Sequence, residues 1–238
     1  MTRATAAASA SQLDRLIAPE IAGDRLSRHL ERLAATAGVR TILDIGASSG
    51  EGSTAALVAG ALRNPDRPVI HCIEVSVTRF EALERRYRDH DFVHCHNVSS
   101  VPLDRFPTEA EIDAFRRRIW TRFRFIRRAE VMRWLRQDIE YVERHGLSAT
   151  GIRSIRERFS IDRFDLVVID GSEFTGPAEL DEVYGARFLA LDDVRTYKNM
   201  DNTRRLDDDP AYRRVAFARR VRNGFAIYER TRASGDGA

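Results

Sequence analysis

The sequence predicts a doubly wound α/β fold with a mainly parallel, seven-stranded sheet, a C-terminal antiparallel hairpin and a helical insertion. Three observations lead to this prediction. Short apolar runs alternate with segments of helical periodicity, as expected where helices cross over between parallel strands. A helical segment interrupts the alternation at about 104–160. Two β-rich runs then flank the turn "RNG", which is typical of a hairpin.

Composition is consistent with one α/β domain that carries an insertion. The chain has 238 residues, of which 43% are hydrophobic. Its apolar runs are shorter than the roughly 20 residues that a membrane span needs, so no membrane association is expected. Cys72 and Cys95 stand apart in predicted strands and do not indicate a disulfide framework, which makes the reducing cytoplasm the expected compartment.

Residues 1–38 are expected to form a frayed tail and helices that cover the sheet. Apolar residues recur at helical spacing over 11–37, which predicts one or two amphipathic helices. The remaining elements, over 39–238, follow in order. Strands are predicted at 39–46, 68–76, 91–99, 164–172 and 187–194, helices at 53–64, 78–90 and 177–186, and the hairpin at 213–231.

The insertion at about 104–160 is rich in arginine and aromatic residues. In "FRRRIWTRFRFIRRAEVMRWLR" the only acid is Glu130. Arginine forks bind phosphate and carboxylate groups, so one interpretation is a lid that contacts a nucleotide-sugar, a phosphorylated glycan or RNA. The other interpretation is a solvated arginine face over an apolar helix face. The sequence leaves both open.

The stretch "LDIGASSGEGS", at 43–53, joins the first predicted strand to the next helix. Such a loop presents backbone N–H groups and a helix N-terminus to a polar or anionic ligand. It lacks both the G-x-G-x-x-G spacing of dinucleotide sites and the Lys-Ser/Thr of a P-loop, which argues against nicotinamide enzymes and NTPases. Glu74 ends the second strand in "CIEVS", where a carboxylate accepts hydrogen bonds from ribose hydroxyls. The two features together indicate an adenosine-containing ligand.

Three further carboxylates end the next two strands of the main sheet. Asp170 ends "VVIDGSEFTG", and Asp192 and Asp193 end "FLALDDVRTYKN". The carboxyl ends of parallel strands lie at one edge, so these acids should converge on the loop. Crowded carboxylates raise one another's pKa values unless a cation or a basic side chain compensates their charge. For a cation, an all-oxygen set suits Mg²⁺, Ca²⁺ or Mn²⁺ rather than zinc.

These motifs resemble the class I S-adenosylmethionine-dependent methyltransferases over most of the chain outside 104–160. "LDIGASSGEGS" is similar to the first motif of that family and "CIEVS" to the second, and "DFVHCHNVS" stands where the family contacts adenine. The resemblance implies a Rossmann-like fold and S-adenosylmethionine as the cofactor. By residue, it implies contacts to the methionine part from Asp44, Gly46 and Gly50, to the ribose from Glu74 and to the adenine from Asn97, with Ser48 in place of the middle glycine.

The acids resemble the metal site of the cation-dependent O-methyltransferases of the catechol and macrocin types. The resemblance implies a divalent ion, Mg²⁺ or Mn²⁺, on Asp170, Asp192 and Asp193. Such an ion would lower the pKa of an acceptor hydroxyl and position its oxygen for methyl transfer. A sugar or glycoside hydroxyl is the expected acceptor, on the macrocin-type resemblance.

Three more side chains are candidates for roles in catalysis or acceptor binding. Glu173 stands where the catechol-type enzymes carry a lysine base. Glu173 is one candidate base, and Lys198 is the other if burial lowers its pKa. Arg195 is a candidate contact for an anionic acceptor.

Alternatives remain at this stage. The arginine-rich insertion allows an RNA methyltransferase, and the fold alone allows a non-catalytic cofactor-binding or interaction protein. The N-terminal helices allow a homodimer contact. A zinc site at His94, Cys95 and His96 is not expected, because strand alternation puts Cys95 on the face opposite the two histidines.

Overall fold

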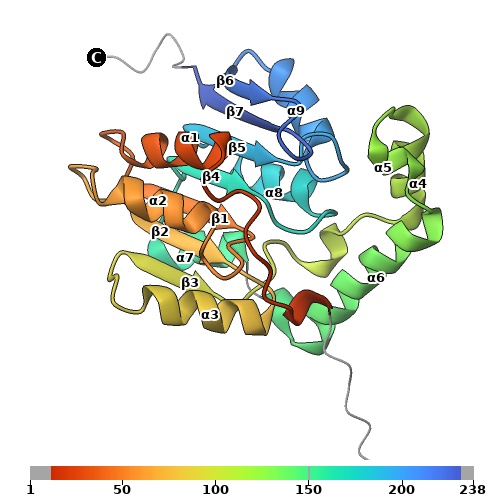
Figure 1. The fold of residues 1–238 in the computed structure, drawn as a ribbon, viewed down its shortest axis with the longest axis horizontal. Helices are drawn as coiled ribbons and strands as arrows, with labels where there is room; N and C mark the ends of the chain where they lie inside the picture. Colours follow the sequence, from red (N-terminus) through yellow and green to blue (C-terminus); the bar gives the residue numbers. More distant parts are fainter. Residues whose placement is uncertain (1–11, 150, 232–238) are drawn as a thin grey trace, which may run out of the picture.

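A computed structural model describes residues 12–149 and 151–231 and contains one seven-stranded sheet (Figure 1). The strand order is β3-β2-β1-β4-β5-β7-β6. The first five strands run parallel, and β7 is antiparallel to both β5 and β6. The predicted doubly wound sheet with its antiparallel hairpin is therefore confirmed. The strands are β1 (Thr41–Ile45), β2 (Val69–Ile73), β3 (Val93–His96), β4 (Leu166–Ile169), β5 (Phe188–Asp192), β6 (Tyr212–Ala218) and β7 (Phe225–Arg230).

Helices pack on both faces of the sheet, and strand alternation divides the core between them. Ile42 of β1 faces the layer of α1, α2 and α3, whereas Leu43 faces the layer of α7, α8 and α9. Both side chains are fully buried. The helices of the first layer are α1 (Arg25–Ala34), α2 (Ser53–Ala61) and α3 (Val77–Tyr87), and those of the second are α7 (Ile152–Phe159), α8 (Gly176–Val183) and α9 (Met200–Asp207).

The N-terminal region is less helical than its apolar periodicity predicts. A 3-10 turn, η1 (Gln12–Asp14), is followed by a non-helical segment, 15–24, and then by α1. Pro19 has no N–H for a helical hydrogen bond, and Gly23 adopts a φ of +71°, so the two residues end any helix before α1. We call residues 12–24 the strap. The predicted tail at 1–11 lies outside the described residues.

The middle of the chain forms a helical lobe beside the sheet (Figure 1). The lobe consists of α4 (Glu109–Arg118), α5 (Arg122–Phe125) and α6 (Arg128–Arg144), preceded by the 3-10 turn η2 (Leu103–Arg105) and followed by η3 (Leu147–Ala149). Thr108 and Glu111 form a capping box that starts α4. The lobe has its own apolar core, formed by Ile112, Phe115, Ile119, Phe123, Val131, Met132, Leu135 and Phe174.

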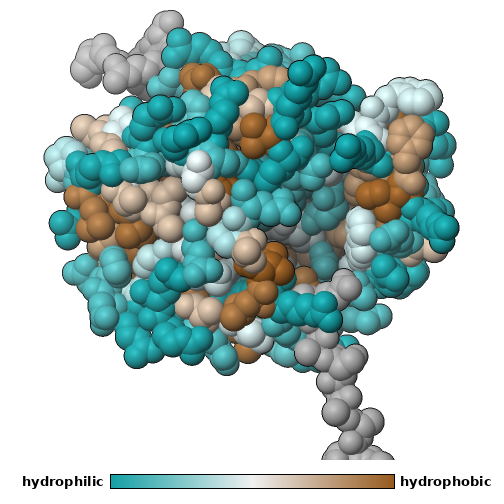
Figure 2. Space-filling view, in the orientation of Figure 1, coloured by the Kyte–Doolittle hydropathy of each residue, from teal (hydrophilic) through white to brown (hydrophobic). Residues whose placement is uncertain are grey.

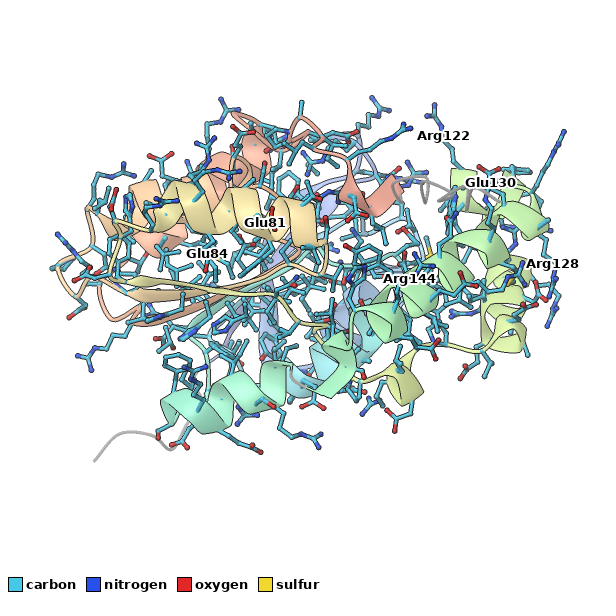
Figure 3. All side chains as sticks on the ribbon, turned by 90° about the horizontal axis from the view of Figure 1, so that it is seen from below. Glu81, Glu84, Arg122, Arg128, Glu130 and Arg144 are labelled. Atoms are coloured by element: carbon cyan, nitrogen blue, oxygen red, sulfur yellow. The ribbon has the colours of Figure 1, made fainter. Side chains whose placement is uncertain are left out.

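Many lobe arginines have acidic partners within the fold. Arg128 pairs with Asp113 and Glu109, and Arg136 pairs with Glu109. Figure 3 shows Arg122, Arg128 and Glu130 toward the outer end of the lobe. These pairs favour the solvated arginine face for much of the insertion. Within residues 12–149 and 151–231, none of the helices combines the length and the hydropathy that a membrane span requires.

Candidate functional site

A cavity of about 450 Å³ lies at the carboxyl edge of the sheet. Its wall combines the loop after β1, the ends of β2 and β5, the loop after β4, the strap and α6. The volume is in the range of small-molecule sites. Of the predicted site residues, Gly46, Ser48, Glu74, Asp170, Asp192 and Asp193 border this cavity.

Gly46 allows the loop after β1 to turn tightly against β4. The Gly46 and Ala47 amides both donate to the Ile73 carbonyl, at 3.0 Å each, and Gly46 has a φ of +87°. A Cβ at Gly46 would lie 2.1 Å from the Asp170 carbonyl oxygen. Only glycine therefore allows this loop to lie directly against the end of β4.

Glu74 is held by the main chain at the cavity wall. Its carboxylate accepts hydrogen bonds from the Ser48 amide at 2.8 Å and from the Ser76 amide at 2.7 Å. Burial raises the pKa of Glu74, and the amide hydrogen bonds oppose that rise. The Ser48 and Ser76 amides reach different oxygens of the carboxylate, and a carboxylate has about four acceptor positions, so it can still accept hydrogen bonds from a ligand.

Three predicted cofactor residues lie behind the wall rather than on it. The Asn97 side chain donates to the Glu74 and Val75 carbonyls, so it fixes the turn after β2. Gly50 adopts a φ of +79° and packs against the Tyr87 ring. Asp44 is fully buried and accepts hydrogen bonds from the hydroxyls of Ser53 and Thr54 at the start of α2.

One carboxylate oxygen of Asp44, Oδ1, is buried without a hydrogen-bond partner among the described residues. Burial raises the pKa of this carboxyl to about 6, against the opposing effect of Thr54 and Ser53. The residue thus supports the loop and the α2 N-terminus from the core side.

The predicted acid cluster contains a lysine. The Lys198 ammonium lies 2.8 Å from Asp170 Oδ1 and 2.9 Å from Asp193 Oδ2. Asp192 instead accepts two hydrogen bonds from the Arg222 guanidinium, at 2.7 and 2.8 Å, and Arg222 also pairs with Asp24 of the strap. All three acids reach the same edge, as predicted, but side-chain cations neutralise them.

These residues do not fit the expected divalent ion. Asp170 and Asp193 share a buried ammonium, and a metal ion on the same oxygens would meet its positive charge at close range. In the described parts of the chain, no group of three or more His, Cys, Asp or Glu side chains is arranged to hold a metal ion. The donor set of the expected metal site is therefore already occupied by Lys198 and Arg222.

Lys198 is also unsuited to act as the base. Burial alone would lower its pKa, but the carboxylates of Asp170, Asp193 and Glu173 raise the pKa of Lys198 well above its usual value. Lys198 could act as a base only if its pKa were lowered. In the structure its pKa is raised, so the ammonium keeps its proton. One signal in the sequence marks this residue, because Lys198 is the only lysine among 39 basic residues.

Glu173 and Arg195 do not border the cavity. Glu173 accepts a hydrogen bond from the Lys198 backbone amide at 3.2 Å, and burial raises its pKa to about 7. Arg195 is half-buried in the segment after β5. Both therefore lie around the Lys198 segment and outside the cavity wall.

Asp138 of α6 borders the cavity and is not among the residues predicted from the sequence. Its carboxylate accepts a hydrogen bond from the Ser172 hydroxyl at 2.5 Å, and burial raises its pKa to about 6. A signal was present, because Asp138 falls at helical spacing between Leu135 and Val142, two buried apolar residues. A carboxylate within an apolar stripe indicates a functional or paired acid.

The lobe holds the segments that carry Glu173 and Lys198. Phe174 and Tyr197, their chain neighbours, both pack in the lobe core. The Tyr197 ring centroid is 4.9 Å from that of Phe115 in α4 and 6.2 Å from that of Phe174. The lobe therefore positions the lysine as well as contributing Asp138.

The strap crosses the cavity beside the loop after β1. Pro19 and Ile21 pack against Gly52, where a Cβ would approach the Ile21 side chain to 2.7 Å. The Tyr141 hydroxyl donates to Asp14 at 2.6 Å and ties the strap to the lobe. Leu16 and Ile17 remain exposed, at 60% and 53%, on a surface where hydrophobic side chains gather in separate patches (Figure 2).

The histidines of β2 and β3 form a separate cluster away from the cavity. His71, His94 and His96 surround the Phe159 ring, with centroids 4.5 to 6.0 Å from it. Cys95 packs in the other core layer. The predicted separation of Cys95 from His94 and His96 is therefore confirmed.

Comparison with known proteins shows similarity at the level of the fold. No family model and no curated protein matches the sequence. The O-methyltransferase from Bacillus cereus, solved in complex with SAH, superposes with a TM-score of 0.53 at 14% identity, over 86% of this chain and 80% of that chain. A protein from Corynebacterium glutamicum gives a TM-score of 0.53 at 13% identity, over 92% and 85%. The chain thus has the Rossmann-like fold seen in S-adenosylmethionine-dependent methyltransferases.

Proposed function

We propose that this chain is an S-adenosylmethionine-dependent O-methyltransferase that acts on a hydroxyl of a small polar acceptor. The observation that carries the proposal is the position of Glu74. Its carboxylate is held at the cavity wall by two backbone amides, next to a glycine loop and the N-terminus of α2. A carboxylate with free lone pairs in this setting is suited to the two hydroxyls of a ribose.

The residues of the cavity fit this cofactor. Glu74 would bind the ribose, and Gly46 and Ser48 would line the methionine part next to the positive end of α2. When bound, S-adenosylmethionine would supply an electrophilic methyl group to the acceptor oxygen, with the neutral thioether SAH as the leaving group. Asn97, Gly50 and Asp44 act indirectly, by supporting the turns that carry these contacts.

Asp138 is the proposed acceptor of the hydroxyl proton. It borders the cavity, and its pKa of about 6 leaves it mostly ionised at neutral pH while still basic enough to take a proton. Ser172 orients the carboxylate by its hydrogen bond. Asp170 and Asp193 border the same cavity, where they can accept hydrogen bonds from other hydroxyls of the acceptor.

A small acceptor with several hydroxyl groups, such as a sugar or glycoside, suits this wall best. Asp138, Asp170 and Asp193 all border the cavity, and carboxylate oxygens can accept hydrogen bonds from hydroxyl donors. The strap and α6 border the cavity on two sides, which favours a small molecule over a folded RNA. A nucleotide-sugar is part of the same proposal, with Arg79 at the cavity wall as the candidate contact for its anionic part.

Calorimetric titration of the full chain with S-adenosylmethionine and with SAH tests the first part of the proposal. We expect saturable binding of both, competed by adenosine. Transfer of a labelled methyl group to a panel of sugars, glycosides and nucleotide-sugars tests the second part. Absence of cofactor binding would contradict the proposal, and binding without transfer to any hydroxyl acceptor would favour the non-catalytic alternative.

A further inference from the structure

The cation inside the acid cluster is built into the chain. Lys198 is 6% exposed, and its ammonium contacts Asp170 and Asp193, one carboxylate from the end of β4 and one from the end of β5. Two of its three N–H groups are used in this way. The lysine therefore bridges the two strand ends, which is the task expected of a divalent ion at this edge.

The lysine is fixed from several directions. The backbone of Lys198 lies so close to Gly176 that a Cβ there would be 1.9 Å from the Lys198 carbonyl oxygen. The Asn199 side chain donates to the Ile169 and Asp192 carbonyls, at 3.0 and 2.6 Å, and Tyr197 packs in the lobe core. Moving the ammonium aside would require this whole segment to move.

The chemistry of the residue is suited to this position. An ammonium is a compact point charge that carboxylates can approach from several directions, much as they approach a metal ion, whereas a guanidinium is a planar fork. The chain carries arginine at its other basic positions and its single lysine at this one. Arg222 compensates Asp192 separately, with two hydrogen bonds to the same carboxylate.

We infer that the Lys198 ammonium takes the place of the divalent cation, so that Asp170 and Asp193 bind acceptor hydroxyls directly and methyl transfer needs no metal ion. This inference rests on the proposed function. Lys198 is then a positioning residue, because it holds two carboxylates at the cavity wall without bordering the cavity itself. The acceptor is selected by hydrogen bonding and not by coordination.

The single lysine permits a direct test that is independent of activity. Protein labelled with ¹⁵N at the lysine side chain carries one such nitrogen, at Lys198. After chelator treatment of the full chain, we expect a single lysine signal that neither shifts with Mg²⁺ nor broadens with paramagnetic Mn²⁺. Saturable broadening by Mn²⁺ at this signal would overturn the inference.

A variant sharpens the test. Removal of the ammonium by Lys198→Ala leaves the carboxylates without their cation, and we expect the folded variant to gain Mn²⁺ binding that a second change, Asp170→Asn, removes. A folded Lys198→Ala protein that takes up no Mn²⁺ would contradict the inference. If this variant does not fold, the wild-type lysine signal still decides.

Activity and cofactor binding separate this inference from the function on which it rests. We expect methyl transfer to change by less than about 2-fold between excess chelator and added Mg²⁺, and SAH binding to be equal in both. Loss of transfer in chelator with SAH binding intact would overturn the metal-free inference alone. Absence of SAH binding would contradict the proposed function, while the lysine signal would still report on the metal.

Discussion

The two ends of the cavity hold their carboxylates in different ways. At one end, main-chain amides of Ser48 and Ser76 bind Glu74. At the other end, the Lys198 side chain binds Asp170 and Asp193 from a segment far along the chain. The backbone of the strand, loop and helix places these amides, so the fold itself determines how Glu74 is held. The second end depends on particular side chains and so can change its chemistry while the fold stays the same.

The largest effect on stability is expected at Gly46, where the loop after β1 lies against the end of β4. In Gly46→Ala the new methyl group would meet the Asp170 carbonyl and would also need a left-handed backbone. We expect the free energy of unfolding to fall by about 3 kcal/mol or more, measured by urea denaturation.

Gly146→Ala is the matched control for this change. Gly146 has a φ of +64° but open space around a Cβ. Gly146→Ala should lower the free energy of unfolding by about 1 kcal/mol, the cost of a left-handed backbone conformation alone. Equal losses in the two variants would show that the contact between the loop and β4 is unimportant.

At the acceptor end, Asp138→Asn should lower kcat/KM about 100-fold, because the amide cannot accept the proton. In the wild-type protein kcat/KM should rise as the pH increases through about 6, where the Asp138 carboxyl ionises. The variant should lose this limb of the pH profile while SAH affinity stays unchanged. Retention of the limb in Asp138→Asn would assign the proton to another group, with Glu173 the next candidate.

At the cofactor end, Glu74→Gln should weaken SAH binding about 10-fold in calorimetry. The glutamine has one acceptor oxygen where two amides donate, so one N–H faces an NH₂ group. Glu81→Gln, an exposed change on α3 labelled in Figure 3, is the control and should bind SAH normally. Unchanged SAH affinity in Glu74→Gln would show that Glu74 does not bind the ribose.

The smallest effect is expected at Arg195. This side chain does not border the cavity, so Arg195→Gln should change KM and kcat by less than about 2-fold. A large rise in KM for an anionic acceptor, with kcat unchanged, would show that Arg195 contacts the acceptor, as predicted from the sequence, and that the acceptor site reaches beyond the cavity wall.

Prediction from sequence succeeded where local pattern decides the structure. Alternation and helical periodicity predicted the strands and crossovers, and "CIEVS" placed Glu74 at the carboxyl edge. Of the one or two amphipathic helices predicted over 11–37, only α1 and the short turn η1 form within the described residues, because Pro19 and Gly23 keep the segment between them from being helical.

Tertiary contacts account for what the sequence could not predict. The contact of Lys198 with Asp170 joins the ends of two different strands, and the carboxylates that raise the lysine's pKa are visible only once the sheet has formed. Asp138 belongs to a helix whose packing against the sheet no local pattern describes.

The order of the charges along the chain has a consequence for biosynthesis. Asp170, Asp192 and Asp193 leave the ribosome before Lys198 and Arg222, which later neutralise them. Until those cations arrive, the growing chain can bury this edge only by protonating the carboxylates or by confining uncompensated negative charge, and both cost free energy. A nascent chain that stops short of Arg222 should therefore keep the end of β5 hydrated, and the full compensation of this edge is complete only when the β6–β7 turn has been made.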